Sequence, residues 1–329
     1  MKNRIVRFCL PIMAAGIFGG CTKLVTVPEP TNTITSAETF SSDASALSAI
    51  AGLYNDVLTG GGGNGYGLAY GNGLTTFDPG MSADELIQYG NSNPFQMMAL
   101  NSSVGDISTF WTRLYFDIYL ANSVIEGVQS STGVSAGTRN QLTGEALFFR
   151  AFCHFYLVNL FGNVPLVTTT AYAVNDTLRR TSAQLVYQQI ITDLKKSEGL
   201  LASDYSISQG QRIRVNSYGA TALLARVYLY TADYTDAEAA ATTVINASNL
   251  YFLENNLNNV FQDTSSEAIL QWQPDNSFYP YATEEGNFLV PFSGNPPNYY
   301  LTNQLQAIPE VAAVFYDLTH KPPGTIEWE

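Results

Sequence analysis

The sequence has 329 residues, of which 46% are hydrophobic and 13% charged, and its formal net charge is −13 at pH 7. This length and composition are enough for a sizeable buried core. The acidic balance, without a cluster of lysine or arginine beyond the first residues, argues against nucleic-acid binding, because an acidic surface repels phosphate backbones.

The first 20 residues have the layout of a secretory signal peptide, which is removed from the mature protein. Basic residues precede an apolar run over residues 8–18, and the small pair Gly19-Gly20 stands directly before Cys21. This order is typical of a bacterial lipobox and predicts that Cys21 carries the lipid anchor, palmitate included, with an ordinary signal peptide as the alternative. Residues 21–36 are rich in proline and threonine and suit an extended tether.

Cysteine usage predicts a mature chain without an intramolecular disulfide. Cys9 leaves with the signal peptide and Cys21 is lipidated, so only Cys153 remains, inside an apolar helix where a lone cysteine is usually a core residue.

A first helix is predicted from Ala37 to Leu58, ending in the glycine-rich stretch GGGGNGYG. Gly60, Gly62 and Gly65 satisfy a G-x-G-x-x-G pattern, but the pattern follows a helix and not a strand. A loop is therefore the expected structure.

A second helix is predicted over residues 107–128, with Arg113 and Asp117 as a surface ion pair one turn apart. Its apolar residues recur at helical spacing and are Ile107, Phe110, Trp111, Leu114, Ile118, Ala121, Ile125 and Val128.

A third helix, over residues 139–161, has large apolar residues on every side and stops at Gly162. Arg150, His154 and Asn159 interrupt it, which excludes a membrane span. Residues 164–167 read as a short extended exit.

A fourth helix is predicted from Ala183 to Leu201, with Ser182 as its cap. Its apolar side is expected to hold Leu185, Ile190, Leu194 and Leu201, and its water-facing side Lys195 and Lys196.

Residues 217–248 then predict two helices joined by a short turn, the second beginning at Asp236. Ala220, Ala222 and Ala225 allow close helix packing, and the tyrosines Tyr228 and Tyr230 are expected to fill the space to the neighbouring helix pair. This pattern resembles a tetratricopeptide repeat, and the third helix lies about two ~34-residue periods earlier. We therefore predict a mainly α fold: a tetratricopeptide-like α-solenoid of helix pairs, whose third helix is covered on all sides by helices.

The chain also resembles the SusD/RagB family of outer-membrane nutrient-binding lipoproteins. The blocks that carry the resemblance span most of the chain: Cys21, SADEL at 82–86, FWTRLYFDIYLANSVIE at 110–126, GEALFFRAFCHFYLVNLFGNVPLV at 144–167, VYQQIITDL at 186–194, SYGATALLARVYLYTADYTDAEAAATTVINAS at 217–248, NVF at 259–261 and SSEAILQW at 265–272.

The resemblance implies a lipid-anchored, surface-exposed protein of the cell outer membrane that binds a glycan or another nutrient and serves a SusC-type TonB-dependent transporter as partner. It divides the chain into a signal peptide (1–20), a lipidated tether (21–36), a helical scaffold (37–272) with a loop insertion near 59–105, and an irregular region (273–329). The tail after residue 305 departs from the family pattern, so a C-terminally truncated product and an incomplete irregular region are expected.

Sugars are held by aromatic faces and by amides and carboxylates in loops outside the helix stripes. Two stretches offer such residues, with packing at the ends of the helix stack as the alternative for each ring. The candidates are Asp84, Tyr89, Asn91, Asn93 and Phe95 in the first stretch, and Trp272, Asn276, Tyr279, Tyr281 and Tyr299 in the second.

No catalytic residue, metal site or cofactor is predicted. The sequence has no H-E-x-x-H, C-x-x-C, G-x-S-x-G or Walker motif, and His154 reads as a core histidine. The alternatives are a protein-interaction scaffold without a small ligand and, less favoured, a glycosidase, whose two facing carboxylates the sequence does not reveal.

Overall fold

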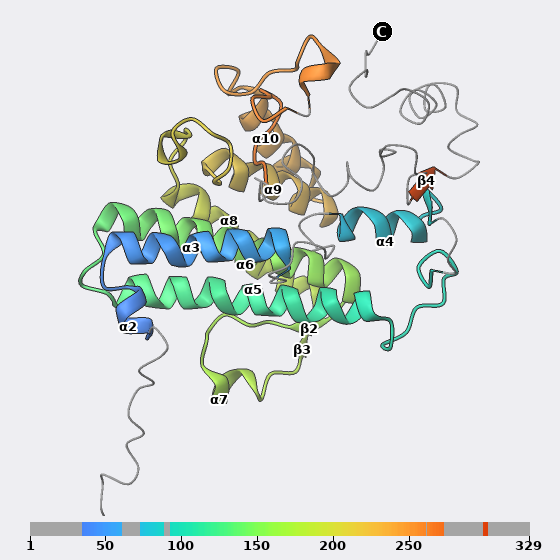
Figure 1. Cartoon of the computed structure of the whole chain (residues 1–329), viewed down its shortest axis with the longest axis horizontal. Coiled ribbons are helices and arrows are strands. Elements are labelled where there is room, and N and C mark those ends of the chain that lie inside the picture. The colour runs from blue at the N-terminus through green and yellow to red at the C-terminus, as the bar shows by residue number, and fades with distance from the viewer. Residues whose placement is uncertain (1–34, 61–72, 89–92, 261, 273–298, 302–329) are drawn as a thin grey trace, which may run out of the picture.

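The computed structural model describes residues 35–60, 73–88, 93–260, 262–272 and 299–301 (Figure 1). Within these residues the protein is mainly α, with helices packed in pairs, as predicted. The helices are α2 (Ser36–Thr39), α3 (Asp43–Thr59), α4 (Leu74–Ser82), α5 (Gly105–Ser130), α6 (Ala136–Phe161), α7 (Tyr172–Asn175), α8 (Ala183–Leu200), α9 (Ser217–Tyr230) and α10 (Tyr234–Ile245), with 3-10 turns η2 (Ser206–Ser208) and η3 (Leu257–Asn259).

Two small antiparallel sheets accompany the helices. β1 (Leu86–Gln88) pairs with β4 (Tyr299–Leu301), and β2 (Val164–Pro165) pairs with β3 (Arg180–Thr181). The predicted extended exit from the third helix is therefore real, because β2 directly follows α6.

The beginning of the described chain is two helices and not the single helix predicted from Ala37. Ser42 starts α3 through a capping box: its hydroxyl accepts from the N–H of Ser45, and the Ser45 hydroxyl accepts from the N–H of Ser42. The break also lets Phe40 pack on Gly127 of α5, where an added Cβ would lie 2.1 Å from the Phe40 ring.

Helices α5 and α6 lie side by side and form a hairpin (Figure 1). Arg139, in the first turns of α6, donates to the carbonyls of Val128, Ser131 and Val134 at 2.9, 2.8 and 3.0 Å. These carbonyls belong to the end of α5 and the turn that follows it, where the helix itself offers no donors. One side chain thus closes the hairpin.

The predicted surface pair of Arg113 with Asp117 is wrong. Nη2 of Arg113 lies 2.7 and 2.8 Å from the two carboxylate oxygens of Asp56 in α3, and Asp117 is buried. Residues one turn apart share one face of a helix, but α3 packs against α5 and supplies the counterion.

Helix α6 is the central helix of the fold. It packs between α5 and α8 and also contacts α3 and α9, and every residue from 141 to 151 is buried. At Gly144 an added Cβ would lie 2.8 Å from Cγ of Leu201. The carbonyl of Gly144 accepts a hydrogen bond from the hydroxyl of Ser197 at 2.7 Å. This confirms that the apolar residues on all sides of the middle of the helix are covered by protein, whereas Leu160 in the last turn is 41% exposed. Among the helices described here, none combines the length and hydropathy needed to span a bilayer.

The apolar side of α8 differs from the prediction by one position. Val186, Ile190 and Leu194 are fully buried, whereas Leu185 is 52% exposed. The buried residues repeat every four positions, and Leu185 lies outside that row. Lys195 and Lys196 face the solvent, as predicted.

The start of α8 is held by a partner from another segment. Ser182 occupies the cap position, but its side chain makes no capping hydrogen bond. Instead, Oδ1 of Asn163, in the turn after α6, accepts from the N–H of Ala183 at 3.0 Å.

Helices α9 and α10 form the predicted hairpin, and α9 also packs on α8. Ala220 is fully buried, as close packing requires. The second helix begins at Tyr234, slightly before the predicted Asp236, because Asp233 is the cap and accepts from the N–H of Asp236 at 3.4 Å.

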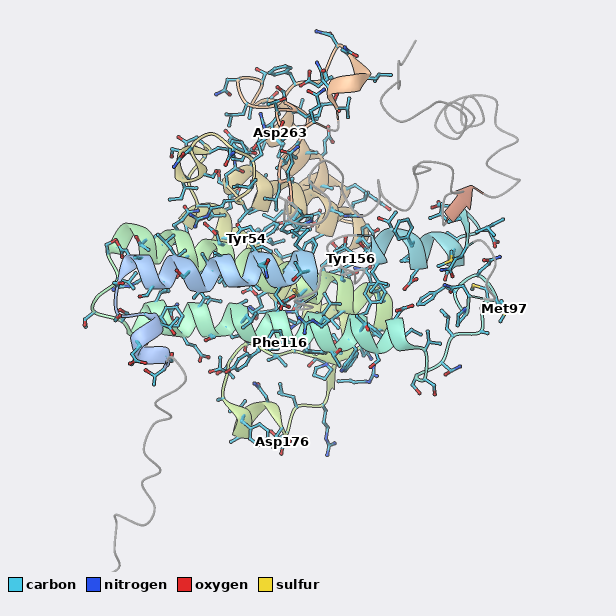
Figure 2. All side chains as sticks on the ribbon, viewed as in Figure 1. Tyr54, Met97, Phe116, Tyr156, Asp176 and Asp263 are labelled. Atoms are coloured by element: carbon cyan, nitrogen blue, oxygen red, sulfur yellow. The ribbon has the colours of Figure 1, made fainter. Side chains whose placement is uncertain are left out.

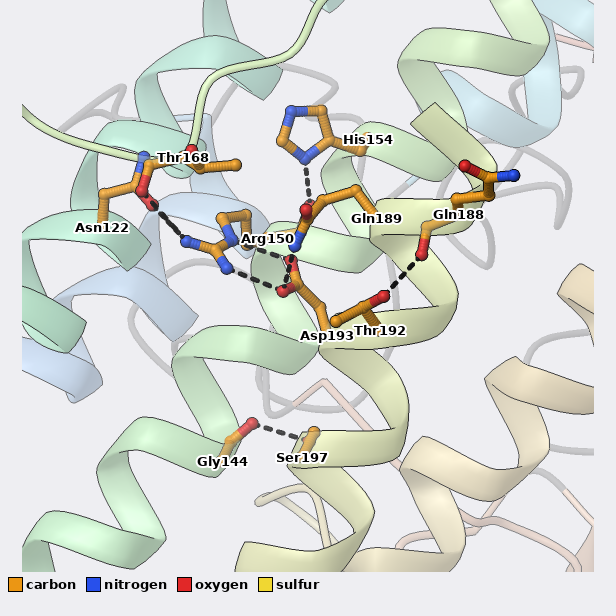
Figure 3. Close-up of polar contacts among 10 residues, drawn as sticks. All are labelled: Asn122, Gly144, Arg150, His154, Thr168, Gln188, Gln189, Thr192, Asp193 and Ser197. Carbon is orange, nitrogen blue, oxygen red and sulfur yellow. Dashed lines mark hydrogen bonds and ion pairs between the residues drawn. The ribbon is translucent and has the colours of Figure 1, made fainter. Parts of the chain in front are cut away.

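A buried polar network joins α5, α6 and α8 (Figure 3). Nε and Nη2 of Arg150 donate to the two oxygens of Asp193 at 2.8 and 2.7 Å, and Nη1 donates to Asn122 at 2.8 Å and to the carbonyl of Thr168 at 3.3 Å. Such a two-pronged arginine–carboxylate pair fixes orientation as well as contact. The network therefore holds three helices and the segment after α6 in one register.

His154, one turn after Arg150, is a core histidine, as predicted. Its Nδ1 lies 2.9 Å from the carbonyl oxygen of Arg150, and its ring is fully buried. Burial, and then the nearby Arg150 charge, lowers the pKa of His154 to about 3. The ring is therefore neutral at physiological pH.

A second small apolar cluster lies beside the main core, between α4, β1 and the segment before α5. Its buried members are Phe77, Met81, Leu86 and Phe95. Asp78 of α4 is only 2% exposed, and its Oδ2 has no hydrogen-bond partner among the described residues. Burial, with a smaller contribution from Asp106 at the start of α5, raises the pKa of Asp78 to about 7.

Replacing Arg150 by methionine should lower the free energy of unfolding by about 3–5 kcal/mol, because Asp193 is left as a buried charge with the Gln189 amide in place of its ion-pair partner. Adding Asp193→Leu should recover most of this loss, since no isolated charge then remains. Urea unfolding followed by circular dichroism measures both. The matched control is Arg113→Met, whose side chain is 25% exposed and whose loss should be smaller. Equal losses in the single and double variants would contradict the role of the ion pair.

Replacing Asp78 by asparagine should raise the melting temperature at pH 8, with a gain that shrinks as the pH falls. The folded-state pKa of about 7 is above the ordinary 3.8, so the folded protein keeps a proton that the unfolded chain has lost. The contribution of the Asp78 carboxyl to stability is therefore fully present below its ordinary pKa and is lost as the pH rises through about 7. Scanning calorimetry from pH 4 to 8 measures the effect, with the exposed Asp263→Asn as control. A gain that does not change with pH would refute it.

Candidate functional site

The structure brings together parts of the two stretches that the sequence predicts to bind a ligand. Strand β1 lies in the first stretch and β4 at the end of the second, with Leu86 opposite Leu301, Ile87 opposite Tyr300 and Gln88 opposite Tyr299. Residues more than 200 positions apart thus become neighbours at the α4 end of the molecule (Figure 1). We name the part formed by residues 84–88 and 93–100 together with β4 the loop surface.

Asp84 is exposed and occupies the position that ends α4. Its φ of 58° lies in the left-handed region, and the N–H of Glu85 donates to the carbonyl of Gly80 at 2.9 Å. This bond closes the helix end in the manner of a Schellman motif, in which glycine or asparagine is the usual residue. The carboxylates of Asp84 and Glu85 both face the solvent.

Three side-chain amides lie close together on the loop surface. Nδ2 of Asn93 donates to Oε1 of Gln88 at 2.9 Å, while Oδ1 of Asn93 accepts from the N–H of Phe95 at the same distance. Oε1 of Gln96 accepts from the N–H of Gln88 at 3.3 Å. All three residues are partly exposed, so the amides order the loop and still present polar atoms to the solvent.

Phe95 has a packing role and does not offer its ring to a ligand. It is 6% exposed and belongs to the small cluster with Phe77, Met81 and Leu86. The alternative to ligand binding, that the ring serves packing, therefore holds for Phe95. The ring anchors the loop from below.

Exposed apolar side chains on the loop surface were not predicted. Met97 is 55% exposed, Met98 67% and Leu100 43%, and Figure 2 shows Met97 at the outer end of the molecule, away from the helix stack. The available signal was a short apolar run in a segment rich in asparagine and serine that has no helical periodicity.

Trp272 packs against the main core in a group of aromatic rings and does not belong to the loop surface. Its ring centroid is 6.3 Å from that of Tyr54, 6.1 Å from Phe149 and 6.4 Å from Phe152. The side chain is partly buried. The structure therefore gives Trp272 a packing role that local sequence did not reveal.

Several predicted residues lie outside the described part of the chain. They are Cys21, Tyr89, Asn91, Asn276, Tyr279 and Tyr281. Their roles remain predictions, as does that of Tyr299, for which only the backbone register is given.

In the described ranges no three His, Cys, Asp or Glu side chains gather in a way that could hold a metal ion. The carboxyl of Asp78, buried behind the loop surface, is half protonated near pH 7. Cys153 and His154 are buried in α6, and neither is on the loop surface.

A family model of SusD-like proteins, described as "Starch-binding associating with outer membrane", matches residues 70–229. These residues include α4, β1 and the amide cluster of the loop surface, as well as the helices α5 to α9.

Curated and solved relatives agree with this match. A SusD-like protein of Bacteroides ovatus is 30% identical over 203 residues, which are 56% of this chain and 36% of that protein. The matched parts span between 27% and 37% of the length of four curated relatives.

Solved structures show the same fold. A SusD superfamily protein of Bacteroides thetaiotaomicron superposes with a TM-score of 0.69 at 22% identity, over 82% of this chain and 62% of that one. A laminarin-binding SusD-like protein gives a TM-score of 0.60 at 24% identity, over 70% and 50% of the two chains. The family model and the curated relatives thus identify residues 70–229 as SusD-like, and the solved structures show the same fold.

Proposed function

We propose that this protein binds a glycan at the loop surface and delivers it, without chemical change, to a SusC-type TonB-dependent transporter in the outer membrane. The observation that carries the proposal is the match of residues 70–229 to a family described as starch-binding and associated with the outer membrane. The matched residues contain α4 and most of the loop surface.

The loop surface has the groups that sugars need. Exposed carboxylates and amides accept and donate hydrogen bonds to hydroxyl groups, and the exposed faces of Met97 and Met98 offer apolar contact to the C–H side of a pyranose ring. The mixture of apolar contact and a few polar groups is typical of a small-ligand site.

The surface favours binding over hydrolysis. Asp84 and Glu85 are consecutive residues on one turn, whereas a glycosidase needs two carboxylates that flank the scissile bond. The glycosidase alternative would therefore need a second acid from residues outside the described part.

Attachment to the membrane is proposed through Cys21. The tether at 21–36 would connect the lipid on Cys21 to the helical scaffold at 37–272. Residues 273–329 would add an irregular region to that scaffold. The transporter partner is proposed on the basis of the family alone.

Replacing Tyr89 by alanine should weaken glycan binding by about tenfold or more, because an aromatic ring that stacks on a sugar is lost, and tenfold corresponds to about 1.4 kcal/mol. Affinity gel electrophoresis against a panel of polysaccharides measures this, with calorimetry for any glycan that retards the wild type. Asp84→Asn should also weaken binding while keeping the helix end intact, because asparagine tolerates positive φ.

The matched control is Tyr172→Ala, an equally large change at a ring that is 77% exposed on α7. Its mobility in glycan gels should equal that of the wild type. Trp272→Ala should lower the melting temperature and leave the affinity of the folded protein unchanged. Unchanged mobility of the wild type with every glycan would favour the protein-interaction scaffold, and release of reducing sugar would favour the glycosidase.

Replacing Cys21 by serine should move the protein from the membrane fraction to the soluble fraction, because the anchoring acyl chains are no longer attached. Fractionation and incorporation of labelled palmitate measure this in a bacterial host that processes lipoproteins. Cys9→Ser, within the signal peptide, is the control and should stay in the membrane fraction. A Cys21→Ser protein that remains lipidated would refute the anchor.

A further inference from the structure

The loop surface is built from segments of the chain that contain no positive charge. Residues 24–112 contain no lysine, arginine or histidine, and neither do residues 227–319. The first of these segments supplies α4, β1 and the amide cluster, and the second supplies β4. The same surface carries the exposed carboxylates of Asp84 and Glu85.

Arginines from the neighbouring helices are already engaged elsewhere. Arg113 is the first basic residue after the loop surface in the chain, and its Nη2 contacts both oxygens of Asp56. Arg150 is held by Asp193, Arg214 by Glu145, and Arg139 by backbone carbonyls. These contacts direct the four arginines toward the helices and away from the loop surface.

Polar recognition at this surface therefore depends on amides, carboxylates and backbone groups. Neutral hydroxyl groups suit all three, because they donate to carboxylates and to amide oxygens and accept from amide nitrogens. A uronate or sulfate group finds no cation there to offset its loss of water. Each anion placed about 4 Å from Asp84 or Glu85 would add roughly 1 kcal/mol of repulsion even at the dielectric constant of water.

We propose that the loop surface selects neutral glycans and rejects uronate-rich and sulfated ones. This inference rests on the proposed glycan binding and specifies its ligand class. The repulsion acts at long range as well as in contact, because a polyanion repeats its charge along the chain and the whole protein carries −13.

The test compares the wild-type protein with neutral and anionic polysaccharides of similar length. Laminarin and soluble starch are the neutral probes, and polygalacturonate, alginate and carrageenan are the anionic probes. Each is measured by calorimetry at low salt and at 0.5 M NaCl, a concentration that leaves only short-range charge interactions (about 4 Å). Anionic probes are measured with EDTA present and with Ca²⁺ present, since a bridging cation would let an acidic surface hold a uronate.

The expected result is binding of at least one neutral glycan with an affinity that changes less than about twofold with salt, and at least tenfold weaker binding of every anionic probe. Binding of an anionic probe as tightly as the neutral ones, with or without Ca²⁺, would overturn the inference and leave glycan binding itself intact. Binding of no probe at all would instead overturn the proposed function.

Two charge-reversal variants separate the effect of charge on the loop surface from the effect of the protein's net charge. Glu85→Lys places a cation on the loop surface, and Glu238→Lys makes the same change in total charge on the exposed face of α10. Glu85→Lys should tighten binding of the anionic probes several-fold at low salt, and the gain should disappear at 0.5 M NaCl. An equal gain from Glu238→Lys would show that only the net charge matters and would overturn the local assignment.

Discussion

Burial of the middle of α6, where every residue from 141 to 151 is buried, is the constraint on which the rest of the structure depends. A helix covered on all sides must find a partner for each polar group that it carries. Arg150 finds Asp193 and Asn122, and Glu145, which is fully buried, receives Nη2 of Arg214 at 2.6 Å and Nε2 of Gln141 at the same distance. Because Asn122, Asp193 and Arg214 come from other elements, satisfying α6 also orients α5, α8 and the segment before α9.

The loop surface depends much less on that core. Its support is the small cluster of Phe77, Met81, Leu86 and Phe95, which is separate from the main one. Loops that carry binding residues commonly rest on a rigid scaffold in this way. Oδ2 of Asp78, buried in α4, has no hydrogen-bond partner among the described residues and adds an energetic cost there, as the buried Nε2 of His154 does in α6.

The sequence predicted the helices well because their signals are local. Apolar spacing located α5, α6, α8 and the α9–α10 hairpin, but the break before α3 was missed because one capping serine among several is a weak signal. Side-chain partners were predicted poorly wherever they come from a distant segment: Asp56 pairs with Arg113, and Asn163 supports the start of α8. The prediction for Leu185 was wrong because neighbouring positions of a helix can lie on its buried and exposed faces, and Val186 is the buried one.

The candidate site was predictable in composition and not in geometry. Two loops rich in aromatic and amide residues can be read from the sequence, but the pairing of β1 with β4 joins positions more than 200 residues apart and has no local signature. Burial of Phe95 and Trp272 likewise depends on which elements meet around them. Charge is the exception: the absence of basic residues over long segments holds wherever the loops lie, so it limits the ligand's chemistry before the geometry is known.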